Sequence, residues 1–190
     1  AGRAPTSSAG RAPTPGHTAD GHFFLAFSYE RVVPGKLLEY VTDFPRVVGG
    51  IDEESTRRAV DLYRTIVRKE ITATSVLAAE LAKTMENAYR DVNIAFSNEM
   101  ARVCEAMGVD VYEIRRLMNA RPDRNMHLPG AGVGGHCLPK DSWLLKFGVD
   151  TYGQARLPVR KIALAREIND EMQLHLADLT VQALAERGVA

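Results

Sequence analysis

The segment from residue 130 to residue 141 reads GAGVGGHCLPKD and places a single thiol, that of Cys137, in a glycine-rich loop. Glycines let the backbone bend sharply and let a ligand approach it closely. We expect a helix to begin at Pro139, directly behind the cysteine. The positive end of that helix, together with the charge of Lys140, would favour the thiolate. The pattern therefore predicts a covalent nucleophile.

Four polar residues elsewhere in the sequence have the side chains that a sulfur nucleophile needs when it acts on a carbonyl group. Lys83 and Asn87 are four residues apart and would share one face of a helix, where they could stabilise an oxyanion. Glu30 follows a short apolar run, and Asp141 lies four residues beyond the cysteine. Either carboxylate could activate a water that hydrolyses a thioester.

Each of these residues also has a simpler interpretation. A lone cysteine is more often part of the packing, although less often when it lies in a loop this rich in glycine. Lys83 and Asn87 are equally typical of a solvated helix face. Glu30 could pair with a neighbouring cation at the surface, and Asp141 could stabilise the first turn of a helix.

The histidines near the cysteine do not form a recognisable metal site. His127 and His136 accompany a single thiol, and this spacing does not match structural zinc sites, so we expect no metal. The glycine loop also lacks the strand and helix that surround a G-x-G-x-x-G dinucleotide fingerprint. A cysteine hydrolase would need a histidine base, but the side chain of His136 is expected to point away from Cys137, so this class ranks last.

The composition, with 45% hydrophobic and 25% charged residues among 190, is typical of a globular protein. The 24 basic and 24 acidic side chains cancel, which argues against a nucleic-acid partner. No apolar run approaches the ~18 residues that span a membrane, and no hydrophobic signal-peptide core precedes the first apolar segment. With only two cysteines, of which we expect Cys104 to be buried, reduced thiols and a cytoplasmic location are predicted.

The hydrophobic pattern predicts a mainly α protein with a small extended fragment near its start. Residues 1–21 repeat the hexapeptide AGRAPT and lack large apolar side chains, which predicts a disordered leader. Short apolar runs predict strands at 22–28, 46–50 and 71–74. Asp52 and Asp110 are expected to cap helices, and Gly108 to end one. Apolar spacing of three and four residues predicts helices at 52–67, 75–107, 110–118, 139–147 and 157–187.

Two of the expected helices have roughly 30 residues and would each be about 45 Å long. That length exceeds the ~26 Å diameter of a compact 100-residue domain. We therefore predict a homodimer, in which each long helix buries one face against a second copy. The alternatives are a single helix broken in two, or burial against further domains.

Five motifs follow one another in order: SYERVVPG from residue 28, GGID from 49, ELAK with NAY and Asn93 from 80, GVGGHCLPKD from 132, and IND from 168. In this order they resemble the nucleotide-sugar 6-dehydrogenases, the UDP-glucose/GDP-mannose dehydrogenase family. The resemblance covers roughly Phe23 to the C-terminus. His136, in place of a serine common in UDP-glucose enzymes, points to the UDP-N-acetylmannosamine/UDP-N-acetylglucosamine branch.

The resemblance implies a long-helix dimerisation domain with a strand segment from the end of an α/β Rossmann domain. Residues 22–50 would be a remnant of the NAD-binding domain, and residues 51–190 the central dimerisation and catalytic-cysteine domain. The family's glycine fingerprint and its C-terminal nucleotide-gripping domain are absent, so we expect this chain alone to be inactive. The alternative is a catalytically silent helical dimerisation module.

The resemblance also implies a reaction, in which the C6 alcohol of a UDP-sugar is oxidised to a carboxylate by two NAD molecules. Cys137 would capture the aldehyde as a thiohemiacetal, which becomes a thioester before water cleaves it. Lys83 and Asn87 would stabilise the oxyanionic intermediates. Glu30 would assist hydrolysis, and Asp141 would position the water.

Several residues of the loop would bind the ligands. Arg121, favoured by spacing over Arg124, would reach the sugar from the second copy of the dimer. Lys140 would contact the cofactor. The remaining substrate contacts implied by the resemblance are Leu128, Gly132, Gly134 and Gly135.

Overall fold

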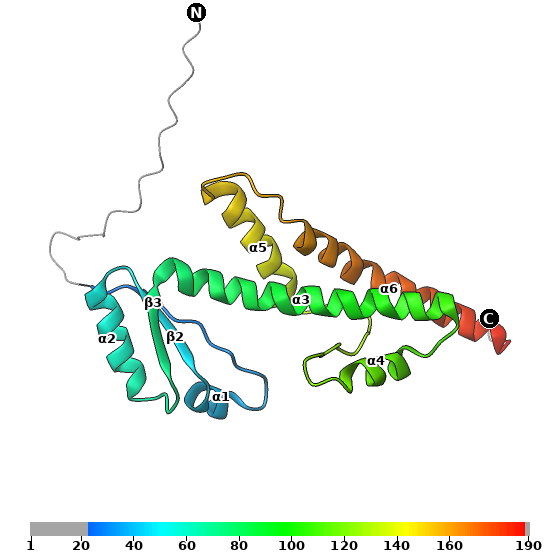
Figure 1. The fold of residues 1–190 in the computed structure, drawn as a ribbon, viewed down its shortest axis with the longest axis horizontal. Helices are drawn as coiled ribbons and strands as arrows, with labels where there is room; N and C mark the ends of the chain where they lie inside the picture. The colour runs from blue at the N-terminus through cyan, green and yellow to red at the C-terminus, as the bar shows by residue number, and fades with distance from the viewer. Residues whose placement is uncertain (1–22, 189–190) are drawn as a thin grey trace, which may run out of the picture. The chain divides into compact units, whose positions relative to one another are not determined.

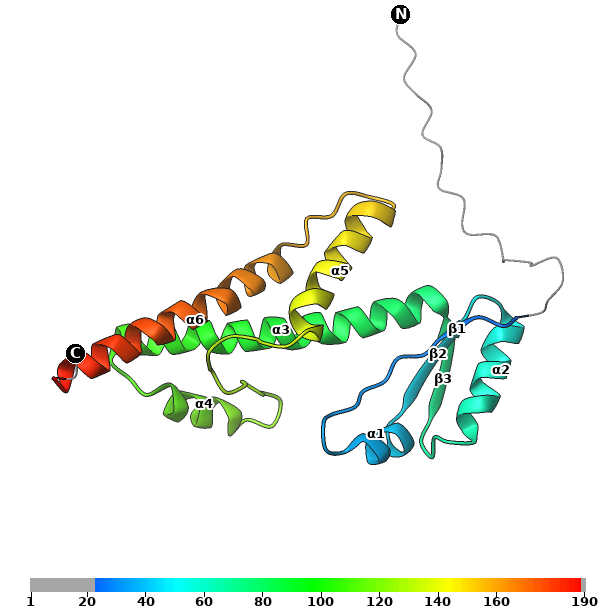
Figure 2. The same ribbon diagram turned by 180° about the vertical axis from the view of Figure 1, so that it is seen from behind.

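The computed structural model describes residues 23–188, which fall into two compact units (Figure 1, Figure 2). The first unit ends at Lys83 and the second begins at Thr84, so the boundary lies inside one helix, α3 (Val76–Met107). Six helices and one three-stranded sheet make up the described residues, which confirms the mainly α fold class. The leader predicted at residues 1–21 lies outside the described part of the chain.

The first unit is built on a sheet of strand order β1-β2-β3. The strand β1 (Ala26–Phe27) runs antiparallel to β2 (Arg46–Gly50), which runs parallel to β3 (Ile71–Ser75). A parallel pair needs a crossover connection, and α2 (Glu53–Arg64) provides it. Val48, on the central strand, is fully buried. All three strands were predicted, although the first is shorter than its apolar run.

The two glycines at the end of β2 are required by close backbone approach. A Cβ atom on Gly49 would lie 2.8 Å from Val76 Cα and closer still to the carbonyl of Ser75. A Cβ atom on Gly50 would overlap the backbone nitrogen of Thr56. Only glycine lets the strand pass this near to the end of β3 and the first turn of α2.

Of the two described helices that lie wholly within the first unit, α2 was predicted and begins with a side-chain cap, whereas the other was not predicted. The Asp52 side chain accepts a hydrogen bond from Ser55 N at 2.7 Å, as expected for the cap of α2, although the helix ends at Arg64 rather than residue 67. The helix α1 (Leu37–Asp43) was not predicted. It has no side-chain cap and buries no residue, although Leu37, Tyr40 and Val41 stand at helical spacing in its short sequence.

The second unit is helical, with α4 (Val111–Asn119), α5 (Cys137–Tyr152) and α6 (Arg160–Glu186) beside the remainder of α3. Gly108, at φ +69°, ends α3, and Asp110 caps α4 by accepting from Tyr112 N at 2.8 Å, both as predicted. The predicted range of α5 was too short at both ends, since it begins two residues earlier than expected and continues beyond residue 147.

The apolar residues that α3 buries within the second unit are small, whereas many of its large apolar side chains are exposed. Cys104 is buried, as predicted. Small side chains allow α6 to run close alongside α3 (Figure 1, Figure 2). The buried apolar residues of α3 in this unit are Ala88, Ala95, Ala101 and Cys104. The exposed large ones along the whole helix are Leu77, Met85, Tyr89, Phe96, Val103 and Met107. Over residues 23–188, no helix combines the length and the apolar character needed to cross a membrane.

The first turn of α2 generates a testable pH dependence. Hydrogen bonds from Arg57 and Arg58 to the Glu54 carboxylate, each at 2.7 Å, lower its pKa from 4.5 to about 2. A depressed folded-state pKa contributes stability that is present above pH 4.5 and is lost as the pH falls towards 2. We predict an NMR titration midpoint near pH 2 for this carboxyl carbon, and loss of this part of the acid sensitivity of unfolding in Glu54→Gln. A midpoint near 4.5 would show that the pairing does not persist in solution.

Candidate functional site

Cys137 is the first residue of α5, and its side chain is exposed. His136, which precedes it, makes no side-chain capping bond. The backbone N–H groups of a first helical turn have no partners within the helix, and they direct the positive end of the helix dipole towards this position. The structure therefore places an accessible thiol at a helix N-terminus. The helix begins at Cys137 itself, two residues before the predicted start at Pro139.

The carboxylate of Asp141, one turn into α5, is held between two donors. Asn87 Nδ2 on α3 donates to its Oδ2 at 2.5 Å, and Lys140 Nζ pairs with its Oδ1 at 2.8 Å. The Asp141 side chain is only 7% exposed. Hydrogen bonding and charge from Asp141, with a smaller electrostatic contribution from Cys137, raise the pKa of Lys140 above its usual value. The structure thus brings together three of the predicted site residues, Asn87, Lys140 and Asp141.

Two further predicted residues meet within the first unit. Lys83 Nζ donates to the backbone carbonyl of Glu30 at 3.2 Å and lies 5.7 Å from the centre of the Tyr29 ring. The Glu30 carboxylate accepts from Val32 N at 2.5 Å, so it is turned back onto its own loop. Lys83 therefore contacts the backbone of Glu30 rather than its carboxylate.

Three glycines of the loop were predicted as substrate contacts, and their backbone constraints differ. Gly132 has φ +89°, and a Cβ atom there would collide with the carbonyl oxygen of Asn169 on α6. Gly135 has φ +82° but open space around it, and Gly134 has neither constraint. Leu128, at the start of the loop, is 61% exposed. Gly132 is therefore fixed by packing, whereas the other two border open space.

The two arginines considered for substrate binding are both exposed and both engaged. Arg121 Nε and Arg124 Nη1 each lie 2.7 Å from the Asp123 carboxylate, one on each oxygen. Their loop is anchored by Asn119, which donates to Met126 O at 3.0 Å and accepts from Met126 N at 2.8 Å. The structure gives no preference for Arg121 over Arg124.

The second unit contains a buried polar cluster that was not predicted from the sequence. Asp91 is fully buried and pairs at 2.8 Å with Arg166, which is 2% exposed. Asn169, from the IND motif, donates to Asp91 as well. One signal was available, because Asn87, Asp91 and Asn98 recur at helical spacing and mark a polar stripe on α3. The full cluster comprises Asp91, Asn98, Ser142, Arg166 and Asn169.

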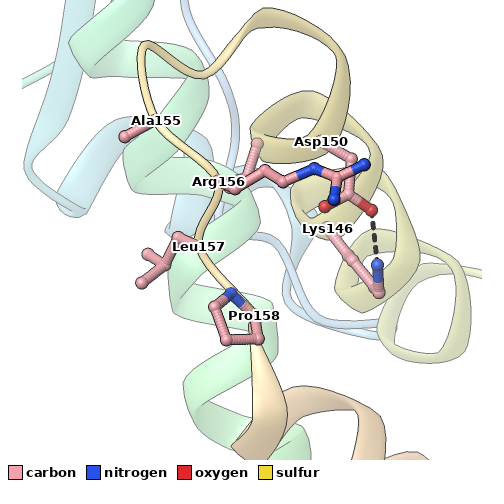
Figure 3. A pocket seen from close by; sticks show the side chains of 7 residues that line it. Lys146, Asp150, Ala155, Arg156, Leu157 and Pro158 are labelled. Atoms are coloured by element: carbon pink, nitrogen blue, oxygen red, sulfur yellow. Dashed lines mark hydrogen bonds and ion pairs between the residues drawn. The ribbon is translucent and has the colours of Figure 1, made fainter.

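A separate cavity of about 500 Å³ lies at the other end of α5 (Figure 3). Lys146 and Asp150 form an ion pair on its wall, and Arg156, Leu157 and Pro158 line it from the loop that follows α5. Cys137 lies at the opposite terminus of the same helix. No group of three His, Cys, Asp or Glu side chains within residues 23–188 is arranged to hold a metal ion.

The described residues do not fit a dinucleotide. Gly49 and Gly50 stand between a strand and a helix, where such a site would need an open glycine cradle. The Cβ positions of both glycines are filled by backbone atoms of neighbouring segments. The N-terminus of α2 is capped by the Asp52 carboxylate, which would repel a phosphate. Lys140, the predicted cofactor contact, is 60% exposed and paired with Asp141.

Comparison with known proteins identifies the class to which this fold and site belong. Residues 77–171 match the central domain of the UDP-glucose/GDP-mannose dehydrogenase family, and the chain belongs to that family. The expected family resemblance is therefore confirmed.

Individual relatives support the predicted branch. UDP-N-acetyl-D-mannosamine dehydrogenase from Pyrococcus horikoshii is 40% identical over 167 residues, 88% of this chain and 38% of the relative. The enzyme of that name from Escherichia coli K12 is 38% identical over 162 residues, 85% of this chain and 37% of the relative. The chain thus spans less than two fifths of these relatives.

Solved structures agree with the sequence comparison. The UDP-D-ManNAc dehydrogenase structure from P. horikoshii matches with a TM-score of 0.80 over 88% of this chain and 38% of that one, at 40% identity. An NDP-N-acetyl-D-galactosaminuronic acid dehydrogenase from Methanosarcina mazei Go1 matches with a TM-score of 0.78 over 88% of this chain and 37% of that one, at 42% identity.

The three glycines provide a graded test of the loop. Gly134→Ala should change the free energy of unfolding by less than about 0.5 kcal/mol, because it meets neither a neighbour nor a positive φ. Gly135→Ala should cost about 1–2 kcal/mol for the left-handed backbone alone. Gly132→Ala adds a collision and should cost roughly 2–5 kcal/mol. Urea unfolding measures all three, and equal costs for Gly132→Ala and Gly135→Ala would contradict the packing of this loop on α6.

Proposed function

We propose that this chain is part of an NAD-dependent UDP-sugar 6-dehydrogenase of the N-acetylhexosamine branch. The observation that carries this proposal is the exposed Cys137 thiol at the N-terminus of α5, one turn from the Asn87–Asp141 pair. Cys137 and Asp141 are both at the start of α5, and Asn87 reaches Asp141 from α3, so a nucleophile and polar groups lie on one helix end where they could act on an aldehyde.

The residues of this chain would act after the alcohol has become an aldehyde. The Cys137 sulfur adds to the aldehyde carbon, and a proton goes to the oxygen, which gives a thiohemiacetal. NAD, held by other parts of a longer protein, would supply the hydride acceptor, and loss of a hydride together with the hydroxyl proton would convert the thiohemiacetal to a thioester. Water then attacks the thioester carbonyl, the carbon–sulfur bond breaks, and the thiol and a carboxylate are released.

Donors on α3 and carboxylates near the cysteine would assist these steps. Lys83 and Asn87 are one turn apart on α3, and their N–H groups would stabilise the oxyanions. Asp141 keeps unused lone pairs and would orient the water, while Glu30 would assist hydrolysis. Since Asn87 donates to Asp141 before any substrate binds, the amide would have to share or exchange that bond.

The remaining assignments follow the family resemblance. Lys140 would contact the cofactor, which other parts of a longer protein would hold. Residues 22–50 would belong to the NAD-binding domain, residues 51–190 to the central domain, and the whole to the cytoplasm. The proposed substrate contacts are Arg121, Leu128, Gly132, Gly134 and Gly135.

A homodimer is the second part of the proposal, and a silent dimerisation module is the alternative function. The exposed large apolar residues of α3, among them Phe96 and Val103, support a partner surface. One observation favours the module, namely that the Cβ positions of Gly49 and Gly50 are filled, so these glycines do not form an open cradle for a dinucleotide.

Sedimentation tests the oligomeric state. The 190-residue chain at micromolar concentration should sediment as a dimer. Replacing the exposed Phe96 and Val103 by Asp should shift it towards monomer, whereas Leu174→Asp on α6 should serve as a matched apolar-to-acid control. A wild-type chain that remains monomeric at about 100 μM would contradict the homodimer.

Activity is best tested in a chimaera, in which residues 23–188 replace the matching segment of the P. horikoshii enzyme. We predict NADH formation from UDP-N-acetylmannosamine by the chimaera and none by the 190-residue chain alone. Cys137→Ala should lower the rate at least about 10³-fold, because the covalent path is lost.

Cys104→Ala provides the matched control, since this second cysteine is buried on α3, and its activity should remain within about twofold of the parent chimaera. Undiminished carboxylate formation by the Cys137→Ala chimaera would refute the nucleophile. An inactive chimaera that is correctly folded and dimeric would favour the silent module.

A further inference from the structure

The Asp91–Arg166 ion pair is the centre of the buried polar cluster in the second unit. Asp91 Oδ1 accepts from Arg166 Nη1 at 2.8 Å and from Asn169 Nδ2 at 2.9 Å. Arg166 also pairs with Asp170, whose side chain is 60% exposed. A buried charge that loses its partner is strongly destabilised, so each member of the pair depends on the other.

One branch of the cluster leads to the start of α5. Ser142 Oγ is fully buried and donates to the second oxygen of Asp91, Oδ2, at 3.2 Å. Ser142 directly follows Asp141, which is bonded to Asn87 on α3. The first turns of α5 are therefore attached to α3 at two successive residues.

A second branch leads to the glycine loop. Asn98 donates to Asn169 Oδ1 at 2.9 Å and accepts from Gly130 N at 2.9 Å. The carbonyl of Asn169 fills the space beside Gly132. The loop is thus attached to the same cluster at its beginning, through a side-chain bond at Gly130 and a backbone contact at Gly132.

We infer that Asp91 is a positioning residue for the segment that carries Cys137. The segment is anchored at Gly130 and Gly132 on one side and at Ser142 on the other, and both anchors meet at Asp91 through fully buried partners. Cys137 itself is exposed and lies between them. This role deepens, and rests on, the proposed covalent function, because holding both ends fixes where the thiol can meet a bound aldehyde.

The competing interpretation is that the cluster only joins α3 to α6. The chain offers a matched control for it, because Arg102 on α3 also pairs with Glu171 on α6, at 2.9 Å, without any bond to the cysteine segment. A residue that merely joins the two helices should loosen both helices evenly when it is changed.

Amide hydrogen exchange of the full 190-residue chain, read segment by segment by mass spectrometry, separates the two roles. Asp91→Asn should speed exchange at residues 130–142 about tenfold or more relative to residues 174–186. Ser142→Ala should affect only the first turns of α5, and Asn98→Ala only residues 128–134. Glu171→Gln should leave residues 130–142 unchanged.

Rescue by a conservative variant adds a second readout. Ser142→Thr keeps the hydroxyl that donates to Asp91, so it should restore slow exchange that Ser142→Ala has lost. Equal exchange in the Ala and Thr variants would overturn the inference, as would an even increase along α3 and α6 in Asp91→Asn. If Asp91→Asn does not fold, Ser142→Ala and Asn98→Ala still decide the question.

These outcomes are separable from the proposed function because hydrogen exchange requires no turnover. An active Cys137→Ala chimaera would refute the nucleophilic role of Cys137, but it would not change the hydrogen-exchange pattern expected for the Asp91 variants. Conversely, Asp91→Asn could speed exchange evenly along α3 and α6 while the Cys137→Ala chimaera is inactive. That combination would refute only the positioning role of Asp91 and would leave the nucleophilic role of Cys137 supported.

Discussion

The helical unit depends on one buried ion pair, that between Asp91 and Arg166. Breaking such a pair by removing one partner costs about 3–5 kcal/mol, whereas replacing both by apolar residues is often neutral. The net stability expected from such a pair is therefore small, and what the pair brings to this unit is a set of hydrogen bonds that join three helices at Asp91. In the observed arrangement of α3, α5 and α6, Asp91 accepts hydrogen bonds from Arg166 Nη1, Asn169 Nδ2 and Ser142 Oγ at once, whereas Arg166 Nε has no hydrogen-bond partner among the described residues.

The helix α3 buries polar side chains and exposes large apolar ones. Its side towards α6 carries alanines, a cysteine and the polar cluster, and several of its largest apolar side chains are exposed. On this side of α3, hydrogen bonds take the place of interlocking large side chains, and larger buried apolar residues of the second unit, such as Leu145, Ile162 and Met172, lie on other helices. Small residues at the contact bring the helices close enough for short side chains, such as those of Asn98 and Asn169, to meet.

The sequence predicted those features that depend on local signals. The caps at Asp52 and Asp110, the stop at Gly108 and the long apolar periodicity of α3 all act within a few residues of where they are seen. The helix α1 lacks a capping side chain, and its apolar pattern extends over only seven residues. Asp91 and Arg166 were missed for another reason, since a charged residue at helical spacing is usually solvated, and only the partner 75 positions away makes its burial possible. Asp141 was recognised as a site residue, but its near-complete burial was not foreseen.

The single tryptophan of the chain occupies a useful place. Trp143 immediately follows Ser142 on α5, and the residue is 46% exposed. Tryptophan emission shifts in wavelength and intensity with the polarity around the indole, and no second indole contributes here. Intrinsic fluorescence of the unlabelled protein will therefore report on the neighbourhood of this one helix, so that a ligand arriving beside α5 can be followed in real time by light alone.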